Sequence, residues 1–477
     1  KRAEVQALFR LAETEERMHD HEPAKQTRQA ALALAEAVAD PYLLAFSHIS
    51  FGHHHTARGG LDRALHHLGE AERHARTSNN TDVLFNSLRY KIYIVLFQGA
   101  YDEAKQLAQL VLAHAQETGN LHMLVNAYWL LGFALVEQGH YEDALTYLHQ
   151  ALAQSDTIGE RHYNLIRVRN MLGYLYREVG DLAAATEWSQ RALATNEHDG
   201  SPYAYECACY SLLDLATTAL AAGDRATAES YFQQFSADYG QPVYAWYRYG
   251  NRAQLFQAEL ALAAHDYSGA IHYATEAEAI AQAESMYKNI IKCRLYQGQA
   301  LLGLQRPQEA LPPLQEAVAL ADKIGHGSLR WQTRLALAEA HAQLGCPTDE
   351  LYHAAWEMVE SIAANLHTPH LCHAFLNSPL VVALREKLTA AAAEASSANT
   401  HVKMEPTATP PYPAGLTVRE VEVLQLVAQG YTDRQISAAL TIAVRTVNTH
   451  VTNILNKTGA QNRTAAAAFA LQHGLVE

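Results

Sequence analysis

The stretch AYWLLGFALVEQGHYEDALTYLHQALAQ, residues 127–154, contains one complete structural unit of this chain. Each half has apolar residues at helical spacing, and the Gly-His-Tyr segment at 139–141 separates the two halves. Two helices joined by so short a turn form a helical hairpin. We expect the helices to cross closely at Ala144, because a larger side chain there would push them apart.

The same hairpin recurs about every forty residues. A turn that ends in alanine is found in GGLDRA, GAYDEA, GHYEDA, GDLAAA, GDRATA, HDYSGA and QRPQEA, whose alanines are Ala64, Ala104, Ala144, Ala185, Ala228, Ala270 and Ala310. Their spacings are 40, 40, 41, 43, 42 and 40 residues. Helix propensity alone would also favour alanine, but near-constant spacing with matching turns indicates repeats. Because one hairpin cannot bury both of its faces, residues 1–395 are predicted to stack into a right-handed all-α solenoid.

These hairpins resemble tetratricopeptide repeats. The signature positions of one copy hold Gly132, Tyr141, Ala144, Leu148 and Ala151. The period departs from the 34 residues that are usual in that family. The resemblance therefore implies longer helices or larger loops between repeats.

A proline-rich segment follows the repeats. Residues 396–415 predict a flexible linker, since Ser, Thr and Ala surround Pro406, Pro410, Pro411 and Pro413. Residues 416–477 predict a small domain of four short helices. Capping-box spacing places two helix starts at Thr417 and Thr432, a third helix runs from about 444 to 457, and a fourth follows Asn462.

The third of these helices has an apolar face and a polar face. Val447, Val451 and Ile454 fall on the apolar side, which would pack on the two preceding helices. A polar outer face on a helix that follows a short helix and a tight turn suits reading of the DNA major groove. An ordinary surface helix is the alternative. In the DNA-binding interpretation, Arg445, Asn448, Thr449 and Thr452 face base edges, and Thr446, Asn453, Lys457 and Arg463 hold phosphates.

The segment LTVREVEVLQLVAQGYTDRQISAALTIAVRTVNTHVTNILNKTGAQNRTAAAA, from residue 416 onward, resembles the LuxR-type helix-turn-helix along its whole length. Repeats followed by such a domain further resemble the MalT-like regulators. That resemblance implies that the repeats receive an inducer and that the terminal domain binds promoter DNA. It also implies that ATP control would lie in a nucleotide-binding domain ahead of Lys1; we assign no cofactor to this chain.

Several polar and aromatic residues of the first helices fall on the expected concave wall of the solenoid. Aromatic faces beside guanidinium groups suit a small molecule such as a sugar, a peptide carboxylate or an acidic protein segment. Ordinary packing between repeats, with solvated arginines, is the alternative. The candidates for binding an inducer or partner are Arg89, Tyr93, Trp129, Phe133, Arg167, Asn170, Tyr174 and Arg177, with Tyr210 and Arg252 further along.

Composition excludes several classes of protein. The net charge of -14 disfavours DNA wrapping along the whole chain. Residues 416–477 carry five Lys or Arg against four Asp or Glu, a net of +1, so the domain would bind DNA weakly alone and a homodimer or higher oligomer is implied. The five scattered cysteines fit a reducing cytosol, and no stretch predicts a membrane span.

The sequence predicts neither a catalytic nor a metal site. Phosphate-loop, HExxH, GxSxG and paired CxxC motifs do not occur. Consecutive helical residues such as His53, His54 and His55 point about 100° apart and cannot converge on one ion, so surface histidines are the favoured explanation.

The combined hypothesis is a cytoplasmic transcriptional regulator of the activating kind, with double-stranded promoter DNA and RNA polymerase as partners and without membrane association. The rival is an interaction scaffold, in which the terminal domain only docks or dimerises. The small-residue-rich final helix, 463–472, would either pair with its twin or pack on its own domain.

Overall fold

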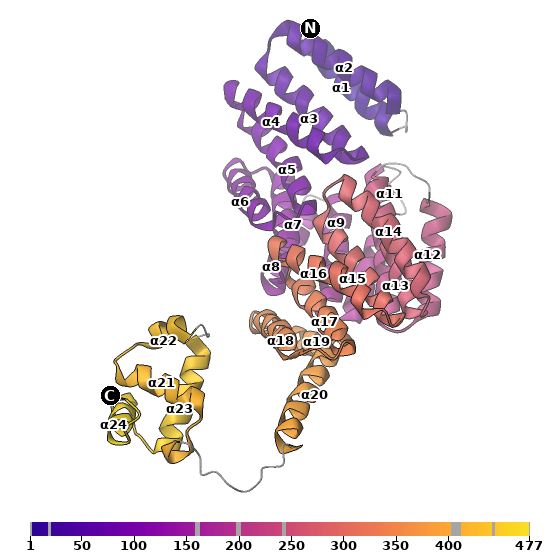
Figure 1. Cartoon of the computed structure of the whole chain (residues 1–477). Helices are drawn as coiled ribbons and strands as arrows, with labels where there is room; N and C mark the ends of the chain where they lie inside the picture. The colour runs from indigo at the N-terminus through magenta and orange to yellow at the C-terminus, as the bar shows by residue number, and fades with distance from the viewer. Residues whose placement is uncertain are drawn as a thin grey trace. The chain divides into compact units, whose positions relative to one another are not determined.

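The computed structural model describes residues 2–17, 21–157, 163–196, 202–240, 245–401, 412–440 and 444–476. Within these ranges every regular element is a helix, so the all-α prediction is confirmed (Figure 1). The chain divides into two compact units, Lys1–Glu394 and Ala395–Glu477. No helix in the described ranges is long and apolar enough to cross a membrane.

The first unit is a series of stacked hairpins, each made of a first helix and a second helix. The first helices are α1 (Arg2–Arg17), α3 (Pro41–Arg58), α5 (Thr81–Phe97), α7 (Leu121–Gln138), α9 (Tyr163–Val179), α11 (Pro202–Ala221), α13 (Trp246–Ala263), α15 (Tyr287–Gly303) and α17 (Gly327–Gln343). The second helices are α2 (His21–Val38), α4 (Leu61–Thr77), α6 (Tyr101–Thr118), α8 (Tyr141–Thr157), α10 (Leu182–Asn196), α12 (Arg225–Tyr239), α14 (Tyr267–Ala283), α16 (Pro307–Ile324) and α18 (Asp349–Ala364). The unit ends with α19 (Pro369–Leu376) and α20 (Pro379–His401).

The repeated alanines occupy one structural position. Each is the fourth residue of a second helix, from α4 to α16. All seven are fully buried, with 0% of their surface exposed: Ala64, Ala104, Ala144, Ala185, Ala228, Ala270 and Ala310. Their burial agrees with the predicted close packing of the two helices at the alanine in these seven copies.

The turn before each of these helices needs a left-handed backbone residue. Glycine supplies it in five copies, for example Gly139 with φ of 81°. The remaining two copies lack glycine, and His265 and Gln305 adopt φ of 59° and 58° there. Since this conformation costs a non-glycine residue about 1 kcal/mol or more, packing of the hairpin outweighs local preference.

The solenoid is wound so tightly that hairpins five apart in the sequence contact each other. The Glu284 carboxylate, after α14, accepts hydrogen bonds of 2.9 Å from the Gly60 amide and 3.0 Å from the Leu61 amide at the start of α4. Two hairpins further along, the Tyr141 and Ser328 hydroxyls lie 3.0 Å apart. The solenoid axis is thus enclosed by one turn of helices.

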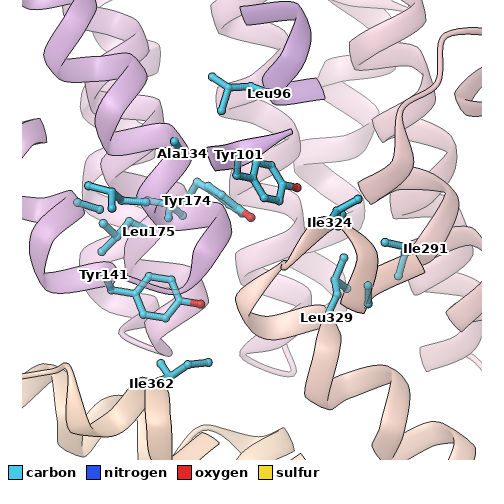
Figure 2. Packing of buried hydrophobic residues seen from close by; sticks show 14 of the residues in the cluster. Leu96, Tyr101, Ala134, Tyr141, Tyr174, Leu175, Ile291, Ile324, Leu329 and Ile362 are labelled. Carbon is cyan, nitrogen blue, oxygen red and sulfur yellow. The ribbon is translucent and has the colours of Figure 1, made fainter. Parts of the chain in front are cut away.

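A continuous apolar core joins these successive turns. Figure 2 shows Tyr101 and Tyr141, at the starts of α6 and α8, within this core, with Ile324 to the right of Tyr101 and Ile362 below Tyr141 in this view. All four side chains belong to one cluster of buried residues that extends from Leu88 to Leu384. The helices α5 to α9 and α13 to α20 therefore share this core, whereas buried residues of α11 and α12, such as Leu212 and Phe235, belong to a separate cluster.

The second unit has the four predicted helices after a short 3-10 turn. Its elements are η1 (Pro413–Gly415), α21 (Val418–Ala428), α22 (Asp433–Leu440), α23 (Val444–Thr458) and α24 (Arg463–Gln472). Val423, Leu424, Ile436, Val447 and Ile454 form the centre of its own core, each at most 1% exposed.

The helix α20 extends into the segment that the sequence analysis takes as linker. It continues to His401, past the expected boundary at residue 396. The Ala- and Ser-containing stretch before Pro406 lacks a helix breaker, which explains the continuation. Residues 402–411, with three of the four linker prolines, lie outside the described residues.

Candidate ligand cavity and DNA-binding helix

The first helices of six successive hairpins, α5 to α15, surround a cavity of about 160 Å³. Seven of the eight residues predicted for the concave wall line it, as do Tyr210 and Arg252. The eighth, Arg89, lines a smaller adjoining hollow together with Tyr93, Trp129 and Arg167. The second helices pack outside the ring formed by these first helices, so side chains of the first helices line the cavity.

One side of the cavity is aromatic. The Tyr93 and Trp129 rings lie 5.9 Å apart, and the Trp129 and Phe133 rings are also separated by 5.9 Å. The Arg167 guanidinium lies over the Trp129 ring at 5.1 Å, and that of Arg248 lies over the Tyr93 ring at 5.0 Å. Such cation–π contacts hold the guanidinium groups against the wall.

The other side carries paired charges. Glu206 accepts from Arg248, with the two groups 3.1 Å apart, and Asp214 bridges Arg177 and Arg252. Burial alone would raise the pKa of Asp214, but Arg252 and Arg177 outweigh burial and hold that pKa below its ordinary value. Asp214 is therefore ionised at neutral pH and fixes its two arginines in place.

A third group of paired side chains connects three cavity helices. The Lys288 ammonium on α15 lies 2.6 Å from Glu137 on α7 and 2.9 Å from the Tyr174 hydroxyl on α9. Glu137 is 1% exposed and also lies 3.2 Å from His326. Burial would raise the pKa of Glu137, yet Lys288 and His326 lower it overall.

The cavity wall carries more cations than carboxylates. Six basic side chains line it, Arg167, Arg177, Arg248, Arg252, Lys288 and Lys292, against the four carboxylates Glu137, Glu206, Asp214 and Glu259. Lys292 forms no ion pair with any residue of the described ranges. Burial, with Lys288 and Arg177 nearby, lowers its pKa, while Glu259 and Glu178 oppose the change.

Two buried donors in the wall lack partners as well. Among the residues that the structure describes, Trp129 Nε1 and Arg248 Nε have no hydrogen-bond acceptor. Trp129 is 7% exposed and Arg248 is 3% exposed. A buried donor without an acceptor costs about 1–3 kcal/mol, so both positions favour an acceptor supplied from outside the chain.

The second unit positions α23 as the sequence predicts. Thr417 and Glu420 form the expected capping box at α21, with Glu420 N 3.2 Å from the Thr417 hydroxyl. Asn462 caps α24 through the Ala465 amide at 2.9 Å. With Val447 and Ile454 buried against the other helices, the opposite face of α23 is left for solvent.

The predicted DNA-facing residues fall into three groups. Thr446, Asn448, Thr452 and Asn453 are exposed, although the Thr452 hydroxyl donates to the Asn448 carbonyl at 2.9 Å. The other two groups are the paired cations Lys457 and Arg463, and two residues, Arg445 and Thr449, whose side chains lie outside the described ones.

The two cations predicted to hold phosphates have partners within the unit. Lys457 Nζ lies 2.7 Å from Glu420 Oε2, and Arg463 contacts the Asp433 carboxylate and the Tyr431 carbonyl. Both side chains remain about one third exposed. A phosphate would therefore share these cations with, or take them from, Glu420 and Asp433.

The comparisons with known proteins agree with both units. Residues 3–329 match the family model of the MalT-like TPR region. The chain belongs to the MalT-like TPR family. Residues 414–470 match the model of bacterial regulatory proteins of the luxR family. The chain therefore joins a MalT-like TPR region to a LuxR-type DNA-binding domain, as the sequence predicts.

Relatives with curated descriptions match through the LuxR-type domain. The response regulator protein VraR of Staphylococcus aureus (strain Mu3 / ATCC 700698) is 48% identical over 62 residues, which are 13% of this chain and 30% of VraR. The protein of the same name from Staphylococcus saprophyticus gives the same values. The chain thus spans less than a third of the length of these relatives.

The MalT-like TPR region resembles a solved repeat structure. A Rap protein complexed with Competence and Sporulation Factor has a TM-score of 0.51 and 13% sequence identity, covering 68% of this chain and 99% of that one. At this identity the likeness concerns the fold alone.

Most of the cavity wall formed by α13 and α15, two of the six helices around the cavity, was not predicted from the sequence. Arg248, Lys288 and Lys292 come from copies six and seven, where Arg252 is the only predicted concave residue. The forty-residue register carries the signal that could have found them, because Arg248 and Lys288 are one period apart. The carboxylates Glu206 and Asp214 were missed because the prediction rests on aromatic, amide and basic side chains.

Proposed function

We propose that this chain is a cytoplasmic, non-enzymatic transcription activator in which a ligand in the cavity of the MalT-like TPR region controls promoter binding. The observation that supports the proposal is the presence, in a chain with a LuxR-type domain, of a cavity that carries unmatched cations and unpartnered donors. An anionic ligand would provide an opposite charge for Lys292 and hydrogen-bond acceptors for Arg248 Nε and Trp129 Nε1. Contact with RNA polymerase would follow binding at the promoter.

On the DNA side, α23 enters the major groove. Asn448 and Thr452, with Arg445 and Thr449, read base edges, and Thr446, Asn453, Lys457 and Arg463 contact phosphates. Because the charge of this domain is close to balanced, two copies are needed to gather enough phosphate contacts. We therefore propose a homodimer or higher oligomer on half-sites about 10 bp apart.

On the ligand side, the proposed occupant is a small molecule with at least one negative charge and an apolar ring or chain. The anionic group would lie near Lys292 on α15, and the apolar part against Trp129 and Phe133 on α7. Burying an unpaired ammonium is costly, and an opposite charge removes that cost. The volume, about 160 Å³, is of the order that accommodates one benzene-sized ring.

A DNA-binding titration of the full chain tests the first part. Fragments selected from a random pool are measured by fluorescence anisotropy at several salt concentrations. We expect competitor-resistant binding that weakens with salt, and a changed sequence preference in Asn448→Ala. If micromolar protein shows no salt-sensitive binding, the scaffold function replaces the regulator, with the terminal domain as a docking or dimerising module.

Calorimetry on the full chain tests the second part with three probes: benzoate, inorganic phosphate and glucose. We expect benzoate to bind most tightly, and Lys292→Met to abolish that binding while raising the thermal stability of the ligand-free protein. The matched control is Lys105→Met on α6, a lysine with a surface partner, Asp102 at 3.3 Å. Glucose binding without benzoate binding would contradict the anionic class.

A peptide or protein is the other occupant to compare. The Rap protein of similar fold is complexed with Competence and Sporulation Factor. A peptide would contact the cavity and also extend beyond it, so its binding would respond to Arg89→Ala in the adjoining hollow. Benzoate binding would be insensitive to that substitution.

A further inference from the structure

A cluster of histidines lies on the second hairpin, on helices α3 and α4, and belongs to neither site described above. His67, Glu70 and His74 follow one another at i, i+3 and i+7 along α4, so they share one face of that helix. His48 on α3 faces them. One ligand atom from each of His48, Glu70 and His74 lies within 4.8 Å of the other two.

The donor set is one that Zn²⁺ prefers. Imidazole nitrogens and a carboxylate oxygen bind Zn²⁺ at about 2.0–2.2 Å in a tetrahedral arrangement, which places the donors about 3.4 Å apart. The three groups are half-buried side chains, so closing the remaining distance of about 1 Å requires only side-chain rotation. The consecutive His53–His55 run excluded by the sequence analysis is a different set of residues.

A third imidazole, that of His67, lies beside His48. Its Nδ1 lies 3.0 Å from Nδ1 of His48, close to the separation of two ligands on one tetrahedral ion. The His67 ring stacks on Phe51 at 4.9 Å and on His55 at 5.6 Å, so its orientation is fixed by packing. A preset ring orientation lowers the cost of ligation.

A cationic side chain already contacts two of the donors. The Arg73 guanidinium lies 2.5 Å from Glu70 Oε2 and 2.8 Å from His74 Nε2. The Arg73 side chain is 59% exposed, so it can turn into solvent when another cation takes its place. The donors therefore attract positive charge, and Arg73 competes with a metal ion for them.

We propose that His48, His67, Glu70 and His74 form a Zn²⁺ site that links α3 to α4. The ion would cross-link the two helices of the second hairpin, whose turn at Gly60 and Leu61 is held by Glu284 from the next turn of the solenoid. Metal binding would thus stabilise the end of the solenoid that contacts α14. This inference is independent of the proposed regulatory function.

Calorimetry with Zn²⁺ on the chelator-treated full chain tests the site, with Co²⁺ absorption as a second measurement. We expect one Zn²⁺ per chain with submicromolar affinity, and intense visible absorption typical of tetrahedral Co²⁺. His48→Ala and His74→Ala should each weaken binding at least 100-fold. Arg73→Ala should strengthen it about tenfold, a gain that misfolding does not produce.

The matched control is His272→Ala on α14. His272 Nε2 lies 3.5 Å from Glu276 on the same helix, and this surface pair has no third metal-ligating group close by among the residues that the structure describes. Its loss should leave the Zn²⁺ affinity unchanged. Equal Zn²⁺ binding by the wild type and a His48→Ala/His74→Ala double variant would overturn the proposal, as would the absence of one-to-one binding or weaker binding by Arg73→Ala.

Discussion

The helix crossings that shape the solenoid predict opposite effects for two Gly-to-Ala substitutions. Gly298 on α15 faces Leu314 on α16, and a methyl group on Gly298 would lie 2.4 Å from the Leu314 side chain. Two other hairpins repeat this contact, and a methyl group would lie 2.7 Å from the leucine both at Gly52 against Leu68 and at Gly132 against Leu148. Gly69 lies on the exposed face of α4, and no atom in the described part of the chain would lie within 4 Å of a methyl group added there.

The expected magnitude for Gly298→Ala is the difference of two terms. Replacing glycine by alanine inside a helix gains about 1 kcal/mol. Forcing a methyl group into a filled crossing costs about 1–3 kcal/mol, and Leu314 is fully buried and cannot turn aside into solvent. We expect a net loss of about 1 kcal/mol for Gly298→Ala and a gain of about 1 kcal/mol for Gly69→Ala.

Native-state hydrogen exchange, read by mass spectrometry on the full chain, measures both effects locally. A change of about 1 kcal/mol corresponds to a roughly fivefold change in exchange rate. Peptides from α15 and α16 should exchange faster in Gly298→Ala, and peptides from α4 should exchange more slowly in Gly69→Ala. Slower exchange in both variants would refute the reasoning, since it would show that the crossing has room for a methyl group.

Three further predictions concern charged residues. Burial raises the pKa of Glu16, but His54 and Arg28 lower this pKa overall from 4.5 to about 2. The free energy of unfolding of α1 to α3 should therefore fall by up to about 3 kcal/mol as the pH falls from 5 to 2. Circular dichroism should show a smaller loss of stability over this pH range in Glu16→Gln. Asp214→Asn leaves two cavity arginines unpaired and should cost about 3–5 kcal/mol in urea unfolding. Lys457→Ala should weaken binding to all DNA sequences alike and reduce the salt slope by about 0.9, measured by anisotropy.

The sequence predicts the hairpins well because each copy contains the residues that determine its own helices and their packing. Ala144 marks the crossing, and the apolar spacing on either side marks the two helices. Capping residues do the same for the second unit, where Thr417 and Asn462 begin the helices that they were expected to begin. These signals involve residues close together in the chain, so they can be recognised in a single sequence.

The contacts between successive turns of the solenoid have no such signal. Glu284 reaches amides 223 and 224 residues earlier in the chain, and it follows α14 without any motif around it. Gly60 occupies the N-cap position before α4 and has no side chain to cap the helix, so the distant carboxylate takes the place of a local cap. These groups meet because of the radius of the solenoid. That radius depends on the crossing angles of all the helices between Gly60 and Glu284.

This closure also determines the chemistry of the cavity. Trp129 and Arg167 come from hairpins near the start of the ring, whereas Arg248 and Lys292 come from hairpins near its end. A ligand that contacts both sets bridges helices that local repeat contacts alone do not hold at a fixed distance. In the proposed regulator, the binding energy of such a ligand would therefore be coupled to the contacts between turns, such as the hydrogen bond from Gly60 to Glu284.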